Sequence, residues 1–70
     1  MDRLSLEASK QEYLADVYAE LERRGAEKGD IPRIIAKTGF MSVLEKYPEE
    51  QLHYDVENTV DEILMTAALS

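Results

Sequence analysis

Apolar residues in this chain recur at intervals of three and four, and this spacing limits the possible folds more than any other feature. The two clearest stripes are Leu14, Val17, Tyr18 and Leu21, and Phe40, Val43, Leu44 and Tyr47. Residues at this spacing share one side of an α-helix, whereas a half-buried strand alternates at every second residue. Because no stretch of the sequence shows that alternation, we predict an all-α protein.

The short length of the chain bounds the interior that its helices can form. Its 70 residues leave room for one domain, so we expect residues 1–70 to form a single helical domain. A chain of this length buries only about 60% of the surface that its unfolded form exposes. It also contains no cysteine to cross-link it. Burial of apolar side chains must therefore supply most of the stability, and a second subunit would add to it.

The first helix is predicted over residues 9–24. Ser9 and Glu12 match a capping box, in which the serine accepts a hydrogen bond from the backbone N–H of the glutamate, whose side chain reaches back. Two arginines follow Glu20 by three and four residues, an order that favours ion pairs along a helix. Gly25 comes directly after them and predicts the end of the helix.

Two short helices are predicted next, over residues 31–38 and 40–47. Asp30 stands where it can cap the first of them, and a proline occupies its first turn, where no backbone N–H is needed. Gly39 ends this helix, since glycine readily takes the left-handed conformation found at helix ends. Pro48 ends the next helix, because the residue before a proline avoids helical backbone angles.

A final helix is predicted over residues 55–69, with Asp55 as its cap. Its apolar positions are Val56, Val60, Ile63, Leu64 and Ala67. The preceding stretch, 49–54, is open between a helical turn and a loop. A continuous helix over 49–69 is the alternative, and we favour the break. The elements together predict a small bundle of three to four helices with short connections.

The net charge of −7 at pH 7 is unevenly distributed. Residues 1–39 contain eight acidic and seven basic residues, whereas residues 40–70 contain seven acidic residues and a single base, Lys46. An acidic surface opposes binding to nucleic-acid phosphates and to anionic membranes. The sequence has no apolar run near the roughly 18 residues of a membrane span and does not start like a signal peptide. We therefore expect a cytoplasmic protein with no membrane contact.

The acidic residues of the last predicted helix form one half of a candidate interaction surface. They are Asp55, Glu57, Asp61 and Glu62. The carboxylates of Glu57 and Asp61 stand four residues apart, a like-charge pair that costs an isolated helix about 0.2–0.5 kcal/mol. A basic surface on a partner protein would relieve this repulsion, and the alternative is an acidic face that is simply solvated.

The apolar end of the same helix, residues 63–69, forms the other half of this surface. Its side chains are apolar on more than one side, which is typical of a helix buried on several sides. Met65 and Leu69 would then contact a partner protein or a second copy, giving a homodimer through this helix. The alternative, that they fold back onto the first helix or onto the N-terminal leucines, stays open.

A helix-turn-helix DNA-binding motif is a possible interpretation of residues 34–43. The sequence departs from that motif, because Ala36 precedes Gly39 by three residues where the motif has a small residue four before its glycine. The helix that would enter the groove of DNA carries Glu45 and few groups that suit phosphates or base edges. Regulation of nucleic-acid transactions, by a degenerate motif of this kind or by an acidic decoy that mimics DNA, is therefore the second hypothesis.

Evidence for an active site or a metal site is weak. Glu50 and His53 have the spacing of a di-metal carboxylate motif, but such sites need a second copy and two further carboxylates. His53 is the only histidine, and no serine or threonine lies near it in the sequence. We expect no enzymatic activity, no cofactor and no metal, and a role as a non-enzymatic protein-interaction or regulatory module.

Overall fold

Helices account for 82% of residues 3–69, the part of the chain that the computed structural model describes. The helices are α1 (Arg3–Arg23), α2 (Ile31–Thr38), α3 (Phe40–Lys46), α4 (Pro48–Leu52) and α5 (Val56–Leu69). These described residues contain five helices and no strand. The prediction of an all-α protein built as a small helical bundle is confirmed.

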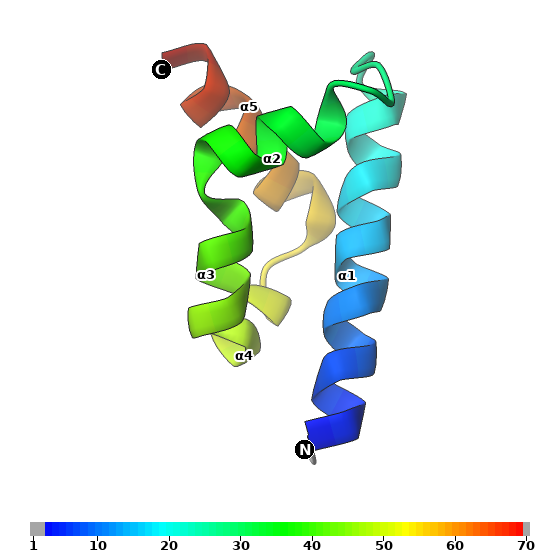
Figure 1. The fold of residues 1–70 in the computed structure, drawn as a ribbon, viewed down its shortest axis with the longest axis vertical. Helices are drawn as coiled ribbons and strands as arrows, with labels where there is room; N and C mark the ends of the chain where they lie inside the picture. Colours follow the sequence, from blue (N-terminus) through cyan, green and yellow to red (C-terminus); the bar gives the residue numbers. More distant parts are fainter. Residues whose placement is uncertain (1–2, 70) are drawn as a thin grey trace.

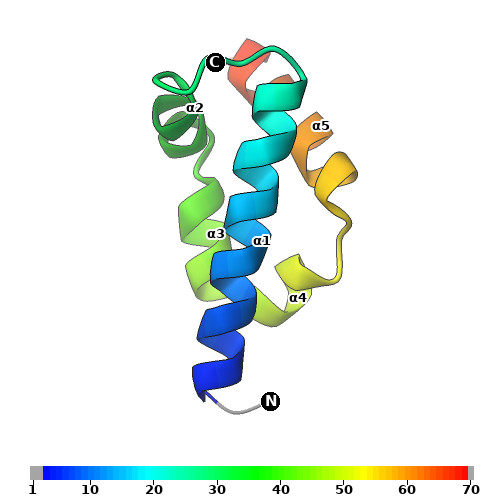
Figure 2. The same ribbon diagram turned by 90° about the vertical axis from the view of Figure 1, so that its right-hand side faces the viewer.

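Helix α1 runs along the longest dimension of a molecule that measures 35 × 20 × 19 Å (Figure 1). Helix α2 crosses near the end of α1, α3 then runs in the direction opposite to α1 on the other side of the molecule, and α5 returns from α4 toward α2. Seen from the side, α3 and the pair α4–α5 flank α1 (Figure 2). Helix α1 packs mainly against α5 and α4, while α2 packs against α5 and α3.

Helix α1 begins at Arg3, so the predicted start at Ser9 is wrong. The capping box of Ser9 and Glu12 does not form, because both residues lie inside a continuous helix. Residues 3–12 contain no glycine or proline and include several strong helix formers, so nothing in them stops the helix. Lys10 is already buried, which shows that this first half of α1 packs against the rest of the protein.

The inner side of α1 follows a line of buried residues, Tyr13, Val17 and Leu21. Leu14 and Tyr18, which we predicted to share the stripe with Val17 and Leu21, are only partly buried and lie beside this line. The line is displaced toward Tyr13 because the hydroxyl of this residue finds hydrogen-bond partners inside the protein.

Lys10 joins the first half of α1 to α3. Its ammonium group donates to Glu7 Oε1 at 3.0 Å and to Glu45 Oε2 at 3.3 Å. These hydrogen bonds, that to Glu7 foremost, raise the pKa of Lys10, so the charge is retained although the residue is 7% exposed. The burial of this charge is possible because both carboxylates reach it.

The end of α1 is a Schellman motif. Gly25 has φ of +102°, and its N–H donates to the carbonyl of Glu22 at 3.0 Å. The next N–H, of Ala26, donates to the carbonyl of Leu21 at 3.0 Å, which satisfies a second carbonyl of the last turn. The stop that we predicted at Gly25 is confirmed.

Helix α2 has the predicted bounds, 31–38, and ends at Gly39 in the left-handed region with φ of +73°. The glycine N–H donates to the carbonyl of Ala36. Asp30 occupies the capping position, but its side chain makes no capping hydrogen bond, contrary to our prediction. Its carboxylate instead accepts a hydrogen bond from Arg33 at 2.5 Å, which competes with the backbone for the same oxygen.

The break between α3 and α5 is confirmed, and the open stretch 49–54 divides in two. A single turn, α4, is followed by a short connection over residues 53–55. Asp55 caps α5 as predicted, because its Oδ1 accepts the N–H of Asn58 at 2.7 Å. At this break the chain changes direction, so that α5 returns toward α2 and packs against α1.

The core lies where α1, α2, α3 and α5 meet. Its buried apolar residues are Tyr13, Val17, Leu21, Ile31, Ile35, Phe40, Leu44, Val60 and Ile63. The rings of Tyr13 and Phe40 stack with centroids 6.4 Å apart. The predicted stripe over residues 40–47 contains four apolar residues, of which only Phe40 and Leu44 are buried in the core. The other two, Val43 and Tyr47, are 43% and 57% exposed.

The left-handed turn between α2 and α3 requires a residue that tolerates a positive φ, and Gly39 occupies this position. We expect Gly39→Ala to lower the free energy of unfolding by about 1–2 kcal/mol, since a Cβ disfavours positive φ. Gly29→Ala is the control, because Gly29 has no positive φ and open space beside it. Chemical denaturation should show no loss for the control, and equal losses in both variants would contradict the role of the turn.

Candidate functional site

The six residues of the predicted interaction surface lie along the solvent side of α5 and at its cap, but they do not act as one patch. They are Asp55, Glu57, Asp61, Glu62, Met65 and Leu69. All six are exposed. Asp55 caps the helix, Asp61 is bound to an arginine at the end of α1, and Glu62 lines a groove on the other side of α5. The other three are not among the residues that line this groove.

Asp61 is bound to the end of α1. The guanidinium of Arg24 donates to Asp61, to Glu20 at 2.8 Å and to the backbone carbonyl of Glu57 at 3.3 Å. Arg23 adds a two-point contact with Glu20, at 2.8 and 2.7 Å. The repulsion that we expected between Glu57 and Asp61 is thus relieved by an arginine of the same chain, without a partner.

Two arginines lower the pKa of Glu20 to about 2. The hydrogen bond from Arg23 has the largest effect, followed by that from Arg24. Arg23 is the last residue of α1 and Arg24 follows it directly, so both pair with Glu20 as the sequence predicted, and Arg24 also reaches α5. This cluster fixes the first turns of α5 against the end of α1.

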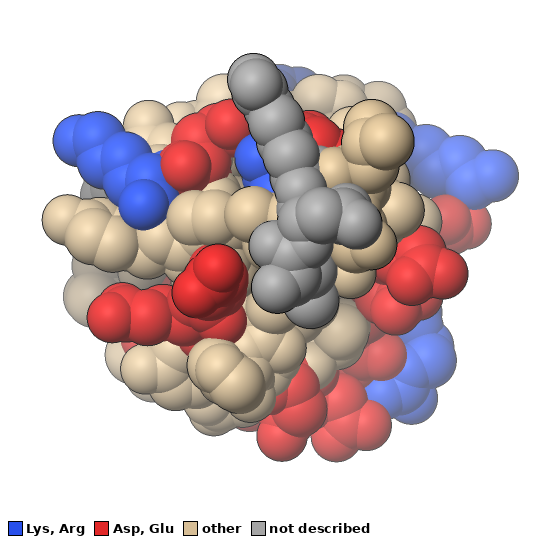
Figure 3. Space-filling model, turned by 90° about the horizontal axis from the view of Figure 1, so that it is seen from below, with Lys and Arg blue, Asp and Glu red and all other residues tan. Residues whose placement is uncertain are grey.

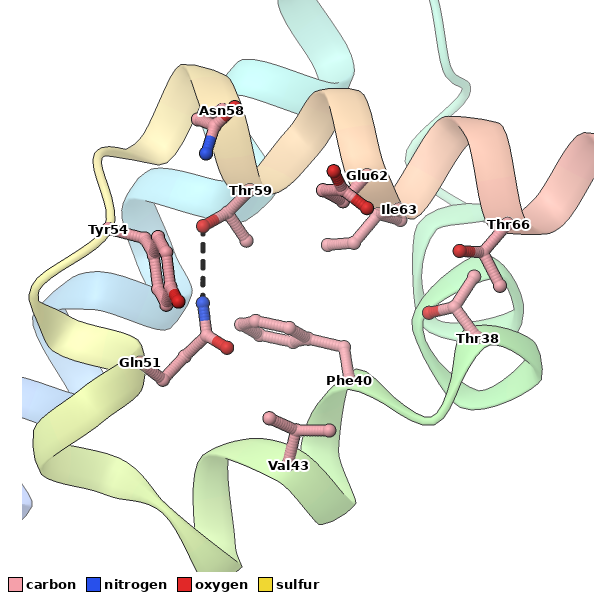
Figure 4. A pocket seen from close by; sticks show the side chains of 10 residues that line it. All are labelled: Thr38, Phe40, Val43, Gln51, Tyr54, Asn58, Thr59, Glu62, Ile63 and Thr66. Carbon is pink, nitrogen blue, oxygen red and sulfur yellow. Dashed lines mark hydrogen bonds between the residues drawn. The ribbon is translucent and has the colours of Figure 1, made fainter.

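An open groove of about 350 Å³ lies on the opposite side of α5, between this helix and α3 (Figure 4). Its floor is apolar, and Phe40 projects into it from the start of α3. Ile63, which is largely buried like Phe40, forms the floor together with it, and Val43, at the rim, is 43% exposed. Glu62 lines the groove from the side of α5.

One end of the groove is built from a buried hydrogen-bond network. The hydroxyl of Tyr13 donates to the carbonyl of Tyr54 at 2.9 Å, so the contact of 2.5 Å with Thr59 uses the proton of the threonine hydroxyl. The side-chain amide of Gln51 donates to Thr59 at 3.2 Å and to Tyr13 at 3.4 Å. The network therefore joins α1, α4, α5 and the connection at Tyr54.

The network also fixes the direction of the Gln51 side chain. Because its amide nitrogen is used by Thr59 and Tyr13, its carbonyl oxygen is turned the other way, into the groove (Figure 4). The ring of Tyr54 lines the same end and is 56% exposed. The groove thus offers an apolar floor, an amide oxygen and a carboxylate.

The sequence analysis placed Glu62 on a binding surface but missed the rest of the groove. Val43 was assigned to the core stripe, and Gln51, Tyr54 and Thr59 were given no role. The stripe predicted for residues 40–47 contains four apolar residues, and the sequence does not show which of them the core takes. Nothing in the local sequence shows that Gln51 and Thr59 meet.

Met65 and Leu69 do not fold back onto α1 or the N-terminal leucines. Their exposed fractions are 59% and 83%, so both side chains lie mostly in solvent. Leu69 follows Glu62 by seven residues, about two turns of helix, and so lies on the same line of α5. The side of α5 that borders the groove therefore continues onto exposed apolar surface.

The structure does not bring the possible metal motif and the possible helix-turn-helix motif together into one site. In residues 3–69, no group of three or more His, Cys, Asp or Glu side chains is placed to hold a metal ion. Glu50 and His53 are both exposed, and His53 lies just beyond the end of α4. Between α2 and α3 a single residue, Gly39, makes the turn, and Glu45 of α3 is bound to Lys10.

Acidic side chains are not confined to α5. At the end of the molecule where α1 starts, they lie on several sides with uncharged surface between them (Figure 3). No helix within residues 3–69 is long and apolar enough to cross a membrane. A scan against protein-family models, a search of curated proteins and a search of solved structures found no match to this chain.

The buried network predicts a specific effect of removing one hydroxyl. We expect Tyr13→Phe to lower the free energy of unfolding by about 1–3 kcal/mol, because the Tyr54 carbonyl loses its donor and Thr59 its acceptor. Tyr18→Phe is the control on the same helix, since the described residues give its hydroxyl no hydrogen-bond partner. Thermal or urea denaturation that showed equal small effects in both variants would contradict this account.

The lowered pKa of Glu20 predicts an acid-dependent loss of stability. A carboxyl whose pKa falls from 4.5 to about 2 on folding stabilises the protein above pH 4.5, and this contribution is lost as the pH falls toward 2. We expect Glu20→Gln to be less stable at pH 7 and to lose less stability than the wild type between pH 4.5 and 2. Urea titrations across this range test it, with Glu12→Gln as an exposed control outside any ion pair of residues 3–69.

Proposed function

We propose that this protein is a non-enzymatic interaction module that binds a segment of a partner protein in the groove between α3 and α5. The observation that carries the proposal is the open groove itself, with the apolar floor formed by Phe40 and Ile63. A concave surface with an apolar floor and a few polar groups at its edges is the usual form of a binding site. The exposed line of α5 that leads to Leu69 would extend the contact.

Exposed apolar side chains at the groove and farther along α5 support a protein partner. Val43, Tyr54, Met65 and Leu69 are each between 43% and 83% exposed. Large apolar patches are uncommon on proteins that act alone, and clusters rimmed by polar residues mark interaction sites. Aromatic residues and methionine are also enriched at the centres of protein interfaces.

The groove supports binding rather than catalysis. Nucleophilic catalysis requires a nucleophile within hydrogen-bond reach of a base that activates it. The hydroxyl of Thr59 is engaged by Tyr13 and Gln51, and no histidine lines the groove. The remaining polar groups can orient a bound segment but form no such pair.

Charge supports a different protein over a second copy of this chain. Residues 40–70, which supply all of the groove lining except Thr38, carry seven acidic residues and one basic residue. A second copy would place the same negative charge against this surface, which costs free energy, whereas a basic segment would be attracted to it. We therefore favour a partner whose contacting segment is basic.

Self-association is the second candidate, and the exposure of Met65 and Leu69 favours it. Both lie beyond the acidic first half of α5, so an antiparallel pair of α5 helices would bring the two apolar ends together and keep the acidic halves apart. This arrangement leaves the groove itself unoccupied. The two candidates therefore differ in which residues contact the partner.

Photo-crosslinking from defined positions tests the proposal in cells of the source organism. A photoreactive phenylalanine analogue would replace Val43 at the groove, Met65 on α5, or Ala15 on the exposed side of α1 as a control. We expect a crosslink to one distinct protein from position 43 and none to that protein from position 15. Added unlabelled wild-type chain and Ala15→Glu chain should suppress the crosslink, whereas Val43→Glu chain should not.

Two results would contradict the proposal. A crosslink that forms equally from positions 43 and 15, or that Val43→Glu chain suppresses as well as wild type does, would show contact without use of the groove. A crosslink confined to position 65 and joining two copies of this chain would instead establish the homodimer through α5.

A further inference from the structure

We propose that the groove binds an arginine side chain of the partner segment, with its methylene stem on Phe40 and its guanidinium between Glu62 and Gln51. This inference rests on the proposed function, because it names the group that the groove would recognise. It is derived from the free acceptors of the groove, from the position of the one charged residue and from the apolar floor between them.

Glu62 is the only charged side chain that lines the groove. Two nearby acidic residues already have partners, since Asp61 is bound to Arg24 and Asp55 caps the helix, and Glu57 does not line the groove. Glu62 is exposed and forms no ion pair with any residue in 3–69. Its carboxylate is therefore available to a cation from outside the chain.

The second acceptor is the side-chain oxygen of Gln51. The donors of this amide are directed to Thr59 and Tyr13, so the groove receives the oxygen and not the nitrogen. Gln51 and Glu62 come from different walls, α4 and α5. A ligand held by these two acceptors must supply donors in two directions, which the guanidinium group does.

The floor between these acceptors is apolar and aromatic. An arginine carries a stem of three methylene groups that can cover apolar surface while its charged end stays at the rim. Phe40 gives the floor an aromatic ring, and the exposed ring of Tyr54 stands at the end where Gln51 lies. Guanidinium groups bind well beside such rings, and better than ammonium groups do where planar contacts are available.

The surrounding charge adds attraction at longer range. Lys46 is the only base among residues 40–70, and seven acids accompany it. A cationic segment is therefore drawn toward this half of the protein before it contacts the groove. The general attraction depends on salt, whereas the contact with Glu62 and Gln51 is specific to one place, so the two effects can be separated by experiment.

Nuclear magnetic resonance titration of the full-length chain with capped tripeptides tests this inference. The probes are glycine-flanked peptides whose central residue is arginine, lysine, glutamate or citrulline, the last being a neutral analogue of arginine with nearly the same shape. We expect the arginine peptide to shift the amide signals of Phe40, Val43 and Thr59 in a saturable manner. The citrulline peptide should bind about tenfold more weakly, because the charge-assisted hydrogen bond is lost.

Two variants with the same change in charge locate the contact. Glu62→Gln should weaken the binding of the arginine peptide by about tenfold. Glu57→Gln, also exposed on α5 but outside the groove, should change the affinity by less than about twofold, since only the screened general attraction is altered. Both variants retain the ion pairs of Arg24, so neither is expected to unfold.

The failure of this inference is distinguishable from the failure of the proposed function. Equal binding of arginine and citrulline peptides in the groove, unaffected by Glu62→Gln, would overturn the assignment of a cation but leave an interaction groove. Shifts scattered over acidic residues outside the groove, or no shifts at all, would overturn the arginine site. The crosslink from position 43 decides the proposed function independently of either result.

Discussion

The hydroxyl group of Tyr13 lies between three helices, and the groove exists in its observed shape because this group is satisfied there. It donates to the backbone at Tyr54 and accepts from Thr59 and Gln51, so that one phenol holds α1, α4 and α5 together. A buried network of this kind is stabilising only when each member has its partner. Since every buried polar side-chain atom in residues 3–69 has a partner, the network fixes one arrangement of α4 against the core.

The charged residues divide α5 into two sides with different tasks. On one side Arg24, held by Glu20, binds Asp61 and attaches the helix to α1. On the other side Glu62 faces the groove without a partner from residues 3–69. Asp61 and Glu62 are therefore neighbours in the sequence with different roles. Asp61 attaches α5 to α1, whereas Glu62 is available for binding.

The candidate site was predictable only in part. The prediction of an interaction surface on the last helix included Glu62, Met65 and Leu69, and all three side chains are exposed. It also included Asp61, whose carboxylate is taken by an arginine 37 residues away in the sequence. Spacing along one helix predicts which side chains share a side, but not which distant residue will reach them.

The sequence by itself determined the helical class, the bounds of α2, the stops at Gly25 and Gly39, and the cap at Asp55. These features depend on backbone conformation and on contacts within a few residues, which local sequence specifies. Tertiary structure alone decided that α1 buries Tyr13 more fully than Leu14 and that α3 leaves Val43 in solvent. Both depend on packing between helices, because the core of so short a chain has space for only some of the apolar residues that periodicity offers to it.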